Sequence, residues 1–406
     1  MKNRFIVIAS STLALTGFAL AAPPIKRARN PVPNAYIVTL SDDVRAVENA
    51  EVLSRRVGAT TRHVYDVVMN GFSINATEQQ VEALARMPGV VEVSEVGQSF
   101  PTDIMYAPPK GLDRIDQREL PLSGSYSFSM YTTATNIYIL DTGIDPHPDF
   151  GTRLVTNKNF ARDANGVLDP ANYTDYGQPI GDRYHGTAAA VIAAGDPHGI
   201  ARWAKIHNIK VCGGTGTPNC FTDDVIAGVN YVTQQRNARP AELHIANASF
   251  SGHDSSFVTP FNNSITAGVA WSFSAGNGDG QVGQDACDFY PAAIAAQRSG
   301  ALSVGASHAA TDVIEVYSNQ GPCVEIFGPD QTEWGSPIGS VMSGTSASAP
   351  HVAGVIAARW ANSPTSSAGE IEGLIKGIAT PDVLTGIWPN TPNLLLHSVL
   401  RKRRPS

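Results

Sequence analysis

Charge is scarce in this sequence, because Asp, Glu, Lys and Arg make up 16% of its residues against about 25% in a typical globular protein. Acidic residues exceed basic ones by 36 to 29, so the formal net charge is −7 and no basic field covers the chain, which argues against nucleic-acid binding. Beyond the N-terminus no apolar run approaches the ~18 residues that cross a bilayer, so no membrane span is expected. The apolar fraction of 42% over 406 residues excludes a disordered chain and suffices for two or three domains.

Cysteine is also scarce. The sequence has four cysteines and no CxxC pair, which argues against a zinc site. In an oxidising compartment an even count indicates disulfide bonds, and four cysteines allow three pairings. Of these we favour Cys212 with Cys220 and Cys287 with Cys323.

The N-terminus has the pattern of a secretory signal peptide. Lys2 and Arg4 precede an apolar stretch over residues 5–20, and Ala19-Leu20-Ala21 is a small-x-small cleavage pattern. We therefore predict a signal peptide over residues 1–21 and a secreted protein. The alternative is an uncleaved anchor helix, for which this apolar run is short.

Residues 34–98 predict a small α+β module. Thr77 and Gln80 form a capping box before a helical pattern, and Asn70-Gly71 indicates a hairpin turn. The β-α-β-β-α-β order is the ferredoxin-like arrangement. Residues 99–110, with three prolines and no periodicity, are expected to be an exposed linker. The elements are expected, in order, over residues 34–40, 43–57, 63–76, 77–85 and 90–96.

From residue 111 onward, apolar strands alternate with helices, which predicts an α/β domain with a doubly wound parallel sheet. Ligand sites in such sheets lie at the carboxyl ends of the strands. The expected strands cover residues 136–140, 205–212, 243–249 and 269–274, and the expected helices cover residues 185–194, 223–236 and a segment from 346.

Three of these element boundaries carry an Asp, a His and a Ser. Asp141 ends one strand, and His185 and Ser346 each open a helix. Taken singly, each is explained by a turn or a helix cap. Together they are the groups of nucleophilic acyl transfer, in which an imidazole held by a carboxylate deprotonates a serine. Asn277, after another strand, is a candidate donor to the oxyanion, although alone it is explained as a turn residue.

The chain order Asp, His, Ser argues against an α/β-hydrolase esterase, whose order is Ser, acid, His around GxSxG. Six motifs stand around these residues, namely 138–144 (YILDTGI), 185–187 (HGT), 274–277 (SAGN), 344–346 (GTS), 349–354 (APHVAG) and 111–118 (GLDRIDQR). These motifs resemble those of subtilisin-type serine peptidases of the proteinase K-like branch, and most closely the secreted bacterial aqualysin-like enzymes.

The resemblance implies a role for each of these residues. Ser346 would be the nucleophile, His185 the general base and acid, and Asp141 the carboxylate that orients the imidazole. Asn277 would complete the oxyanion hole with the backbone N–H of Ser346. Residues 34–98 resemble the family's inhibitor propeptide, which implies a self-cleaving precursor with a propeptide over residues 22–102 and a peptidase domain over residues 103–406.

The resemblance also places the substrate. An extended polypeptide would add as a strand. Polypeptide substrates and the chain's own propeptide are therefore the expected partners. The resemblance also implies a monomer without an organic cofactor. The wall of the P1 pocket carries no charge, which predicts a preference for apolar or aromatic P1 residues. The implied substrate-binding residues are Ser249, Phe250, Ser251, Gly252, Ala275, Gly276 and Phe221, the last within a facing strand over residues 219–222.

A structural Ca²⁺ is the one expected cofactor. Five side chains with oxygen atoms lie close together in the sequence, between residues 113 and 125. Oxygen atoms are the ligands of Ca²⁺, although by composition alone this segment would be a polar surface loop. The same positions form a calcium site in aqualysin-like relatives, and the resemblance therefore favours Ca²⁺ here. Glu325, where proteinase K-like enzymes carry a calcium carboxylate, is a second candidate. The five residues are Asp113, Asp116, Gln117, Ser123 and Ser125.

The chain departs from the family pattern near these motifs without losing a reacting group. Tyr184 and Val191 replace glycines around the His185 motif, and Ala188 replaces a second histidine. Ala347-Ser348 replaces Met-Ala after the nucleophile. Two other functions stay open, namely a catalytically silent peptide-binding protein on the same fold and a peptide ligase.

Overall fold

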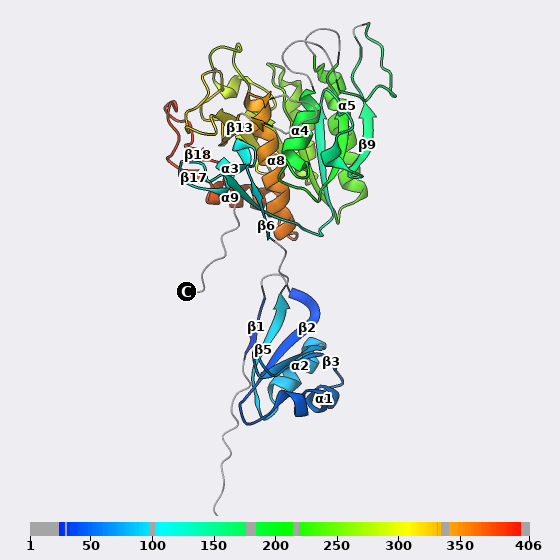
Figure 1. Ribbon diagram of the computed structural model, residues 1–406. Coiled ribbons are helices and arrows are strands. Elements are labelled where there is room, and N and C mark those ends of the chain that lie inside the picture. Colours follow the sequence, from blue (N-terminus) through cyan, green and yellow to red (C-terminus); the bar gives the residue numbers. More distant parts are fainter. Residues whose placement is uncertain are drawn as a thin grey trace, which may run out of the picture. The chain divides into compact units, whose positions relative to one another are not determined.

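A computed structural model describes residues 24–28, 31–97, 102–163, 165–175, 184–213, 219–330, 332–333 and 341–398. The predicted signal peptide, residues 1–21, lies outside these residues. The chain forms two compact units, Met1–Ser99 and Phe100–Ser406 (Figure 1).

The first unit has the predicted β-α-β-β-α-β order with one additional strand. Its sheet has the order β1-β5-β2-β4-β3, in which β1 runs parallel to β5 and the other neighbours are antiparallel. The capping box of Thr77 and Gln80 opens α2, as predicted. The elements are β1 (Ile25–Lys26), β2 (Pro31–Leu40), α1 (Ala46–Arg56), β3 (Thr60–Tyr65), β4 (Gly71–Asn75), α2 (Glu78–Ala85) and β5 (Val90–Gly97).

The hairpin between β3 and β4 differs from the predicted two-residue turn. Residues 66–70 connect the strands, and Gly71 is the first residue of β4. The Asn70 side chain binds the start of α1 instead, because its Oδ1 accepts the N–H of Ala46 at 3.0 Å and its Nδ2 donates to the carbonyl of Ser41 at 2.9 Å. Asn70 therefore ties the hairpin to the helix.

The prediction that residues 99–110 are an exposed linker is wrong in part. β6 (Thr102–Tyr106) pairs antiparallel with β7 (Ser125–Ser129), and α3 (Lys110–Asp116) begins within the stretch. The three prolines lie outside β6, so they do not interrupt its ladder. The partner strand β7 follows β6 only after α3 and a loop. A pairing over this distance leaves no local periodicity in the sequence.

The second unit is built on a nine-stranded sheet in the order β17-β18-β14-β13-β12-β11-β8-β10-β9. All neighbours from β18 to β9 are parallel, which confirms the predicted class of fold, and β17 is antiparallel. The strands are β8 (Thr135–Asp141), β9 (Leu154–Asn159), β10 (Lys205–Lys210), β11 (Leu243–Ala248), β12 (Ala270–Ser274), β13 (Ala301–Ser307), β14 (Ile326–Pro329), β17 (Thr380–Pro381) and β18 (Leu394–Leu395).

Helices cover both faces of this sheet. The α-helices after α3 are α4 (His185–Ala194), α5 (Thr222–Ala238), α6 (Val258–Thr266), α7 (Ala292–Ala295), α8 (Thr345–Asn362) and α9 (Ala368–Ile378). Short 3₁₀ turns η1 (Pro148–Phe150), η2 (Ser255–Phe257) and η3 (Ala286–Asp288) and the two-stranded sheet of β15 (Thr332–Glu333) and β16 (Val341–Met342) complete the unit.

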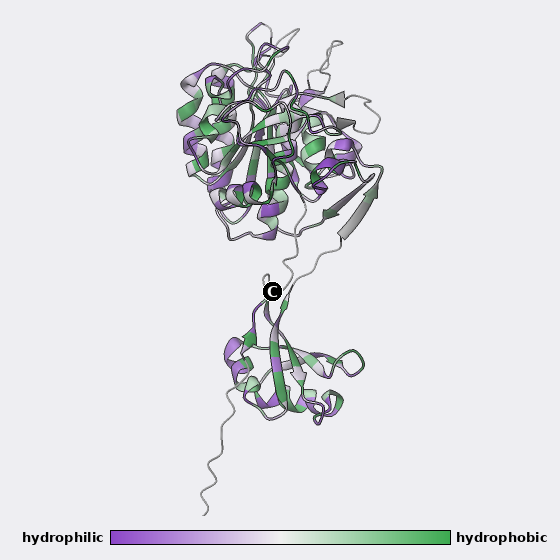
Figure 2. Ribbon diagram, turned by 90° about the vertical axis from the view of Figure 1, so that its left-hand side faces the viewer, coloured by the Kyte–Doolittle hydropathy of each residue, from purple (hydrophilic) through white to green (hydrophobic). Residues whose placement is uncertain are grey.

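The central strand β8 separates two hydrophobic cores. Ile137 and Ile139 pack into a core shared with α3, α4, α8 and α9, while Tyr138 and Leu140 pack into a core shared with α5, α6 and α7. Hydrophobic colour is concentrated on the strands in the middle of the unit (Figure 2). Because both faces are buried, the strand reads as a continuous apolar run in the sequence.

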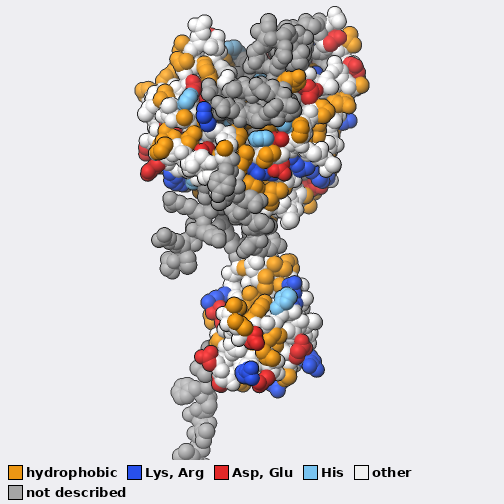
Figure 3. Space-filling model, viewed as in Figure 1, with side chains coloured by type: hydrophobic (Ala, Val, Ile, Leu, Met, Phe, Trp, Pro, Cys, Tyr) orange, Lys and Arg blue, Asp and Glu red, His pale blue; other side chains and the backbone are white. Residues whose placement is uncertain are grey.

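Two disulfide bonds join Cys212 to Cys220 and Cys287 to Cys323, the pairings favoured from the sequence. In the part of the chain that the structure describes, no helix is both long and apolar enough to cross a membrane. Where side chains are coloured on the face seen in Figure 3, basic and acidic groups are interspersed.

Candidate active site

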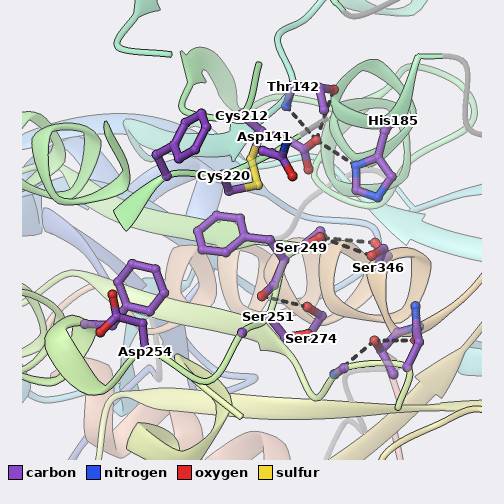
Figure 4. A pocket seen from close by; sticks show the side chains of 18 of the residues that line it. Asp141, Thr142, His185, Cys212, Cys220, Ser249, Ser251, Asp254, Ser274 and Ser346 are labelled. Carbon is purple, nitrogen blue, oxygen red and sulfur yellow. Dashed lines mark hydrogen bonds and ion pairs between the residues drawn. A yellow bond between two sulfur atoms is a disulfide. The ribbon is translucent and has the colours of Figure 1, made fainter. Parts of the chain in front are cut away.

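A cleft of about 600 Å³ lies at the carboxyl ends of the sheet strands (Figure 4). Side chains from the ends of β8 and β12, from the segments after β10 and β11, and from the start of α8 reach it. The lining residues are Asp141, Thr142, His185, Cys212, Asn219, Cys220, Phe221, Thr222, Ser249, Phe250, Ser251, Gly252, Asp254, Phe257, Ser274, Gly276, Asn277, Gly278, Gly280, Thr345 and Ser346.

Asp141 and His185 form a hydrogen bond in this cleft. Asp141 is the last residue of β8, His185 is the first residue of α4, and the imidazole Nδ1 lies 2.6 Å from Asp141 Oδ1. Because a carboxylate accepts this bond, Nδ1 carries the proton and Nε2 is the basic ring nitrogen. Asp141 is 2% exposed, and its carboxylate also accepts the N–H of Thr142 at 2.7 Å. The backbone directly after β8 therefore fixes the position of the carboxylate.

α4 begins very close to the end of β8. At Gly186 a Cβ atom would lie 2.2 Å from the carbonyl oxygen of Gly143, so only glycine fits, and the Gly186 N–H donates to Thr142 Oγ1 at 3.0 Å. The preceding Tyr184 has a φ of 64°, in the left-handed region that favours glycine, and its ring packs on the core beside α4. Tyr184 does not line the described cleft.

A second buried carboxylate, which no sequence motif indicated, joins these two elements. Asp175 Oδ1 accepts the Thr142 hydroxyl at 2.6 Å, and Oδ2 accepts the N–H and the hydroxyl of Thr187 at 2.8 and 2.5 Å. Burial raises the pKa of Asp175, whereas the hydrogen bonds from Thr142 and Thr187 act in the opposite direction. The network thereby links the strand that carries Asp141 to the helix that carries His185.

Ser346 lies in the first turn of α8, where helix N–H groups have no partner within the helix. Its hydroxyl donates to the carbonyl oxygen of Ser249 at 3.1 Å, and the Ser249 hydroxyl donates to the carbonyl oxygen of Ser346 at 3.0 Å. These reciprocal bonds fasten the helix start to the segment after β11. Ser346 and His185 face the same cleft, with Asp141 beside His185 (Figure 4).

The amide of Asn277 is oriented by Thr345, a second residue that the sequence argument missed. Asn277 Oδ1 accepts the N–H of Thr345 at 3.0 Å and its hydroxyl at 2.8 Å, so Nδ2 is the donor end of the amide. Gly344, with a φ of 93°, allows this approach, because a Cβ there would lie 2.9 Å from Asn277 Nδ2. The Gly-Thr pair before Ser346 therefore positions the amide.

Six of the seven expected substrate-binding residues line the cleft, and they come from three segments of the chain. Ser249 to Gly252 form one, Phe221 belongs to the second, and Gly276 belongs to the third. Ala275 is fully buried and is not among the lining residues. Sequence reasoning had not named Asp254 and Phe257, which line the cleft beyond Gly252.

The Cys212–Cys220 disulfide closes a hairpin at the cleft wall. Gly213 and Asn219 exchange two backbone hydrogen bonds of 2.9 and 2.8 Å inside the disulfide loop. Both half-cystines line the cleft, and the returning arm of the hairpin leads directly into Phe221. The disulfide thus fixes one wall of the site.

Another Asp–His pair lies outside the cleft. His198 Nδ1 is 2.7 Å from Asp149 Oδ2, close to the geometry of the Asp141–His185 bond. Neither residue lines the cleft. The presence of Ser346 and Asn277 in the same cleft therefore distinguishes the Asp141–His185 pair.

The five residues expected to bind calcium lie together around the end of α3. Ser123 contacts three of the other four. Its hydroxyl donates to Asp113 Oδ1 at 3.0 Å and lies 3.0 Å from the Ser125 hydroxyl. Its N–H donates to Gln117 Oε1 at 2.9 Å. Burial raises the pKa of Asp116 to about 6, and the charge of Asp113 adds to this effect while a hydrogen bond from the backbone of Ser127 opposes it. The donors are all oxygens, which suits a hard cation such as Ca²⁺.

Two further observations concern metals. The described part of the chain has no group of three or more His, Cys, Asp and Glu residues placed to hold a metal ion, and the cluster at α3 contains only two carboxylates. Glu325 Oε1 lies 2.8 Å from Lys376 Nζ, so the ammonium group of Lys376 pairs with the second candidate carboxylate.

A parallel α/β sheet that brings Asp, His and Ser to one cleft defines the class of serine hydrolases. Comparison with known proteins narrows this class. Residues 132–391 match the model of the subtilase family, and residues 35–95 match peptidase inhibitor I9. The chain therefore belongs to the subtilase family and is a subtilisin-type serine peptidase that carries an N-terminal inhibitor I9 domain.

Individual relatives agree with this assignment. The chain is 32% identical to an extracellular serine proteinase of Thermus sp. (strain Rt41A), over 84% of this chain and 78% of that protein. It is 30% identical to alkaline serine protease ver112 of Corniculantispora psalliotae, over 94% of this chain and 97% of that protein. The crystal structure of a cold adapted subtilisin-like serine proteinase aligns with a TM-score of 0.61 and 29% identity, over 73% of this chain and all of that one.

Proposed function

We propose that this protein is a secreted endopeptidase that hydrolyses polypeptides through an acyl-enzyme and is made as a self-cleaving precursor. The observation that carries the proposal is the Asp141–His185 hydrogen bond in the cleft that Ser346 also lines. The signal-peptide pattern, the two disulfides and the extracellular Thermus relative support secretion. The I9 domain supports synthesis as an inhibited precursor.

In the acylation step, the Ser346 hydroxyl would donate to His185 Nε2 in place of the Ser249 carbonyl to which it donates here. As Oγ attacks the scissile carbonyl carbon, the hydroxyl proton passes to Nε2 and a tetrahedral oxyanion forms. The oxyanion would accept hydrogen bonds from Asn277 Nδ2 and from the backbone N–H of Ser346. Collapse breaks the C–N bond, and His185 returns the proton to the leaving amine.

Deacylation repeats these steps with water. His185 takes a proton from the water as its oxygen attacks the acyl carbon, and returns it to Ser346 Oγ when the C–O bond to the enzyme breaks. Throughout, Asp141 keeps the imidazole in the required tautomer and stabilises its protonated form. Thr345 acts on the reaction indirectly, because it holds the Asn277 amide with Nδ2 outward.

A fluorophosphonate probe tests this proposal directly. The probe should label the protein at one residue, and mass spectrometry should locate the label on Ser346, because only an activated serine reacts. A catalytically silent peptide-binding protein would stay unlabelled. Label on another serine, or none on the matured protein, would overturn the proposal.

We further expect the P1 pocket to prefer apolar and aromatic residues. Ser249, Phe250, Ser251, Gly252 and Gly276 carry no charge, so a charged P1 side chain would be desolvated without a partner. With alanine fixed at the other positions, kcat/KM for P1 Phe or Leu should exceed that for P1 Lys or Asp by about 10²-fold. A peptide-library profile dominated by basic P1 residues would contradict this expectation.

Calcium is proposed as a structural cofactor held by oxygens of Asp113, Asp116, Gln117, Ser123 and Ser125. A bound ion would neutralise the two carboxylates and stabilise the native state by about 2.7 kcal/mol at 100 times its Kd. The unfolding temperature should therefore fall in excess EDTA and recover in millimolar Ca²⁺.

Asp116→Ala should abolish this response, whereas Glu119→Gln, which changes an exposed neighbouring carboxylate, should retain it. Differential scanning calorimetry would measure both variants. Melting curves of the wild type that superimpose in EDTA and in Ca²⁺ would mean that no stabilising calcium site exists.

A further inference from the structure

Asp254 lies at the end of the cleft away from Ser346 and His185 (Figure 4). It is exposed, it follows the segment Ser249–Gly252, and it contacts the opposite segment, because the hydroxyl of Thr222 donates to its Oδ2 at 2.5 Å. This bond connects the two segments that line the cleft at this end. Asp254 therefore closes the end of the cleft with a carboxylate.

Three aromatic side chains share the cleft with this carboxylate. Phe221, next to Thr222, is 45% exposed, and Phe250 and Phe257 pack with their ring centroids 6.3 Å apart. All three phenylalanines line the cleft. A side chain entering here meets both apolar faces and a carboxylate, an environment suited to a long side chain with an apolar stem and a cationic end.

The local charges favour a cation in this subsite. Among the described residues that line the cleft, Asp141 and Asp254 are the carboxylates, and no Lys or Arg occurs. Arg162 approaches Phe221 from outside, with its guanidinium 5.1 Å from the ring centroid, but it pairs with Asp223 and Asp224. Its charge is thus offset.

Hydrogen bonds keep Asp254 ionised without using all of its acceptor sites. The Thr222 hydroxyl and the N–H of Ser256 each donate to one carboxylate oxygen and lower the pKa of Asp254. A carboxylate offers about four lone-pair directions, so acceptor capacity remains for a guanidinium or an ammonium group.

We propose that Asp254, Phe221, Phe250 and Phe257 form a subsite that selects an arginine or lysine of the substrate N-terminal to the P1 residue. The inference rests on the proposed function, in which Ser249–Gly252 walls the P1 pocket and pairs with the substrate strand. Because Asp254 lies beyond this segment, the extended substrate reaches it with a residue that precedes P1. The preference for arginine or lysine applies to this residue of the substrate and not to its P1 residue.

The test uses internally quenched peptides with phenylalanine fixed at P1, in which each of the three preceding positions is changed in turn to Arg, Lys, Gln or Glu. At one position kcat/KM should be highest for Arg and Lys, lower for Gln and lowest for Glu, with an Arg-to-Gln ratio of about 2 to 5, as expected for an exposed ion pair. The ratio should fall as NaCl is raised from about 0.05 to about 0.5 M, because salt screens the pair.

Asp254→Asn removes the charge, keeps the shape of the side chain and can still cap η2, and it should bring the Arg-to-Gln ratio to about 1. Asp254→Ser, which also retains a cap, should do the same and guards against a folding defect of the first variant. Asp285→Asn is the matched control, because Asp285 caps η3 with the same 2.9 Å bond but does not line the cleft. It should keep the wild-type ratio.

The outcomes separate this inference from the proposed function. If the wild type cleaves the peptides without preferring Arg or Lys at any of the three positions, or if both Asp254 variants keep the wild-type ratio, the subsite is refuted and the peptidase stands. If no peptide is cleaved, the proposed function fails, and the subsite fails with it.

Discussion

Ser346→Ala is expected to lower kcat for peptide hydrolysis by about 10⁶-fold, to the limit of detection, and to leave the fold intact. The substitution removes the one oxygen that can form the acyl-enzyme. It deletes a single hydrogen bond, from the hydroxyl to the carbonyl of Ser249. Hydrolysis of casein and of a P1 Phe peptide measures activity, and circular dichroism with thermal melting checks the fold.

The same variant tests self-maturation. The full-length Ser346→Ala precursor, produced alone, should keep its N-terminal unit covalently attached, which gel electrophoresis and N-terminal sequencing would show. Ser348→Ala is a control on the same helix, because it removes the bond to the carbonyl of Gly328 without touching Ser346. A Ser346→Ala protein that matures and digests casein would mean that the nucleophile is wrongly assigned.

Asp141→Asn is expected to lower kcat at neutral pH by about 10⁴-fold. An amide at this position would donate to Nδ1 of His185 and not accept from it. The ring proton would then sit on Nε2, which could no longer take the proton of Ser346. Stopped assays with a P1 Phe peptide would measure the loss, and the fluorophosphonate labelling rate should fall in parallel.

Asp149→Asn is the control for this experiment. It changes the carboxylate of the Asp149–His198 pair, which has a similar distance but lies outside the cleft. Activity should stay near that of the wild type. If Asp149→Asn costs as much activity as Asp141→Asn, the loss reports general destabilisation, and the orienting role of Asp141 is refuted.

The local sequence predicts the position of a site residue where that residue lies at the end of a strand or the start of a helix. Asp141 and Asn277 follow apolar strands, and His185 and Ser346 begin helices, so a parallel sheet brings them to one edge without further information. The same reasoning missed β9 and β13. The polar LVTNKN of β9 and the small residues ALSVGAS of β13 lack the large apolar run that identified the other strands.

The missed residues of the site act through distant partners. Asp175 is held by Thr142, 33 positions earlier, and Thr345 acts on Asn277, 68 positions earlier. Asp254 belongs to no motif of the sequence, and its partner Thr222 lies 32 positions earlier. None of these contacts leaves a periodicity or a spacing in the sequence, because each depends on how the sheet brings strand ends together.

The Cys212–Cys220 hairpin has a thermodynamic consequence for substrate binding. A peptide that adds as a strand must usually restrict the loop that receives it, and the entropy of that loop is then subtracted from the binding free energy. Here the disulfide and the two Gly213–Asn219 backbone hydrogen bonds restrict the wall that leads into Phe221 before any peptide arrives. This wall therefore loses little conformational entropy on association, and a larger share of the loss falls on the substrate, so unstructured polypeptides with few residual contacts should be bound more readily than folded ones.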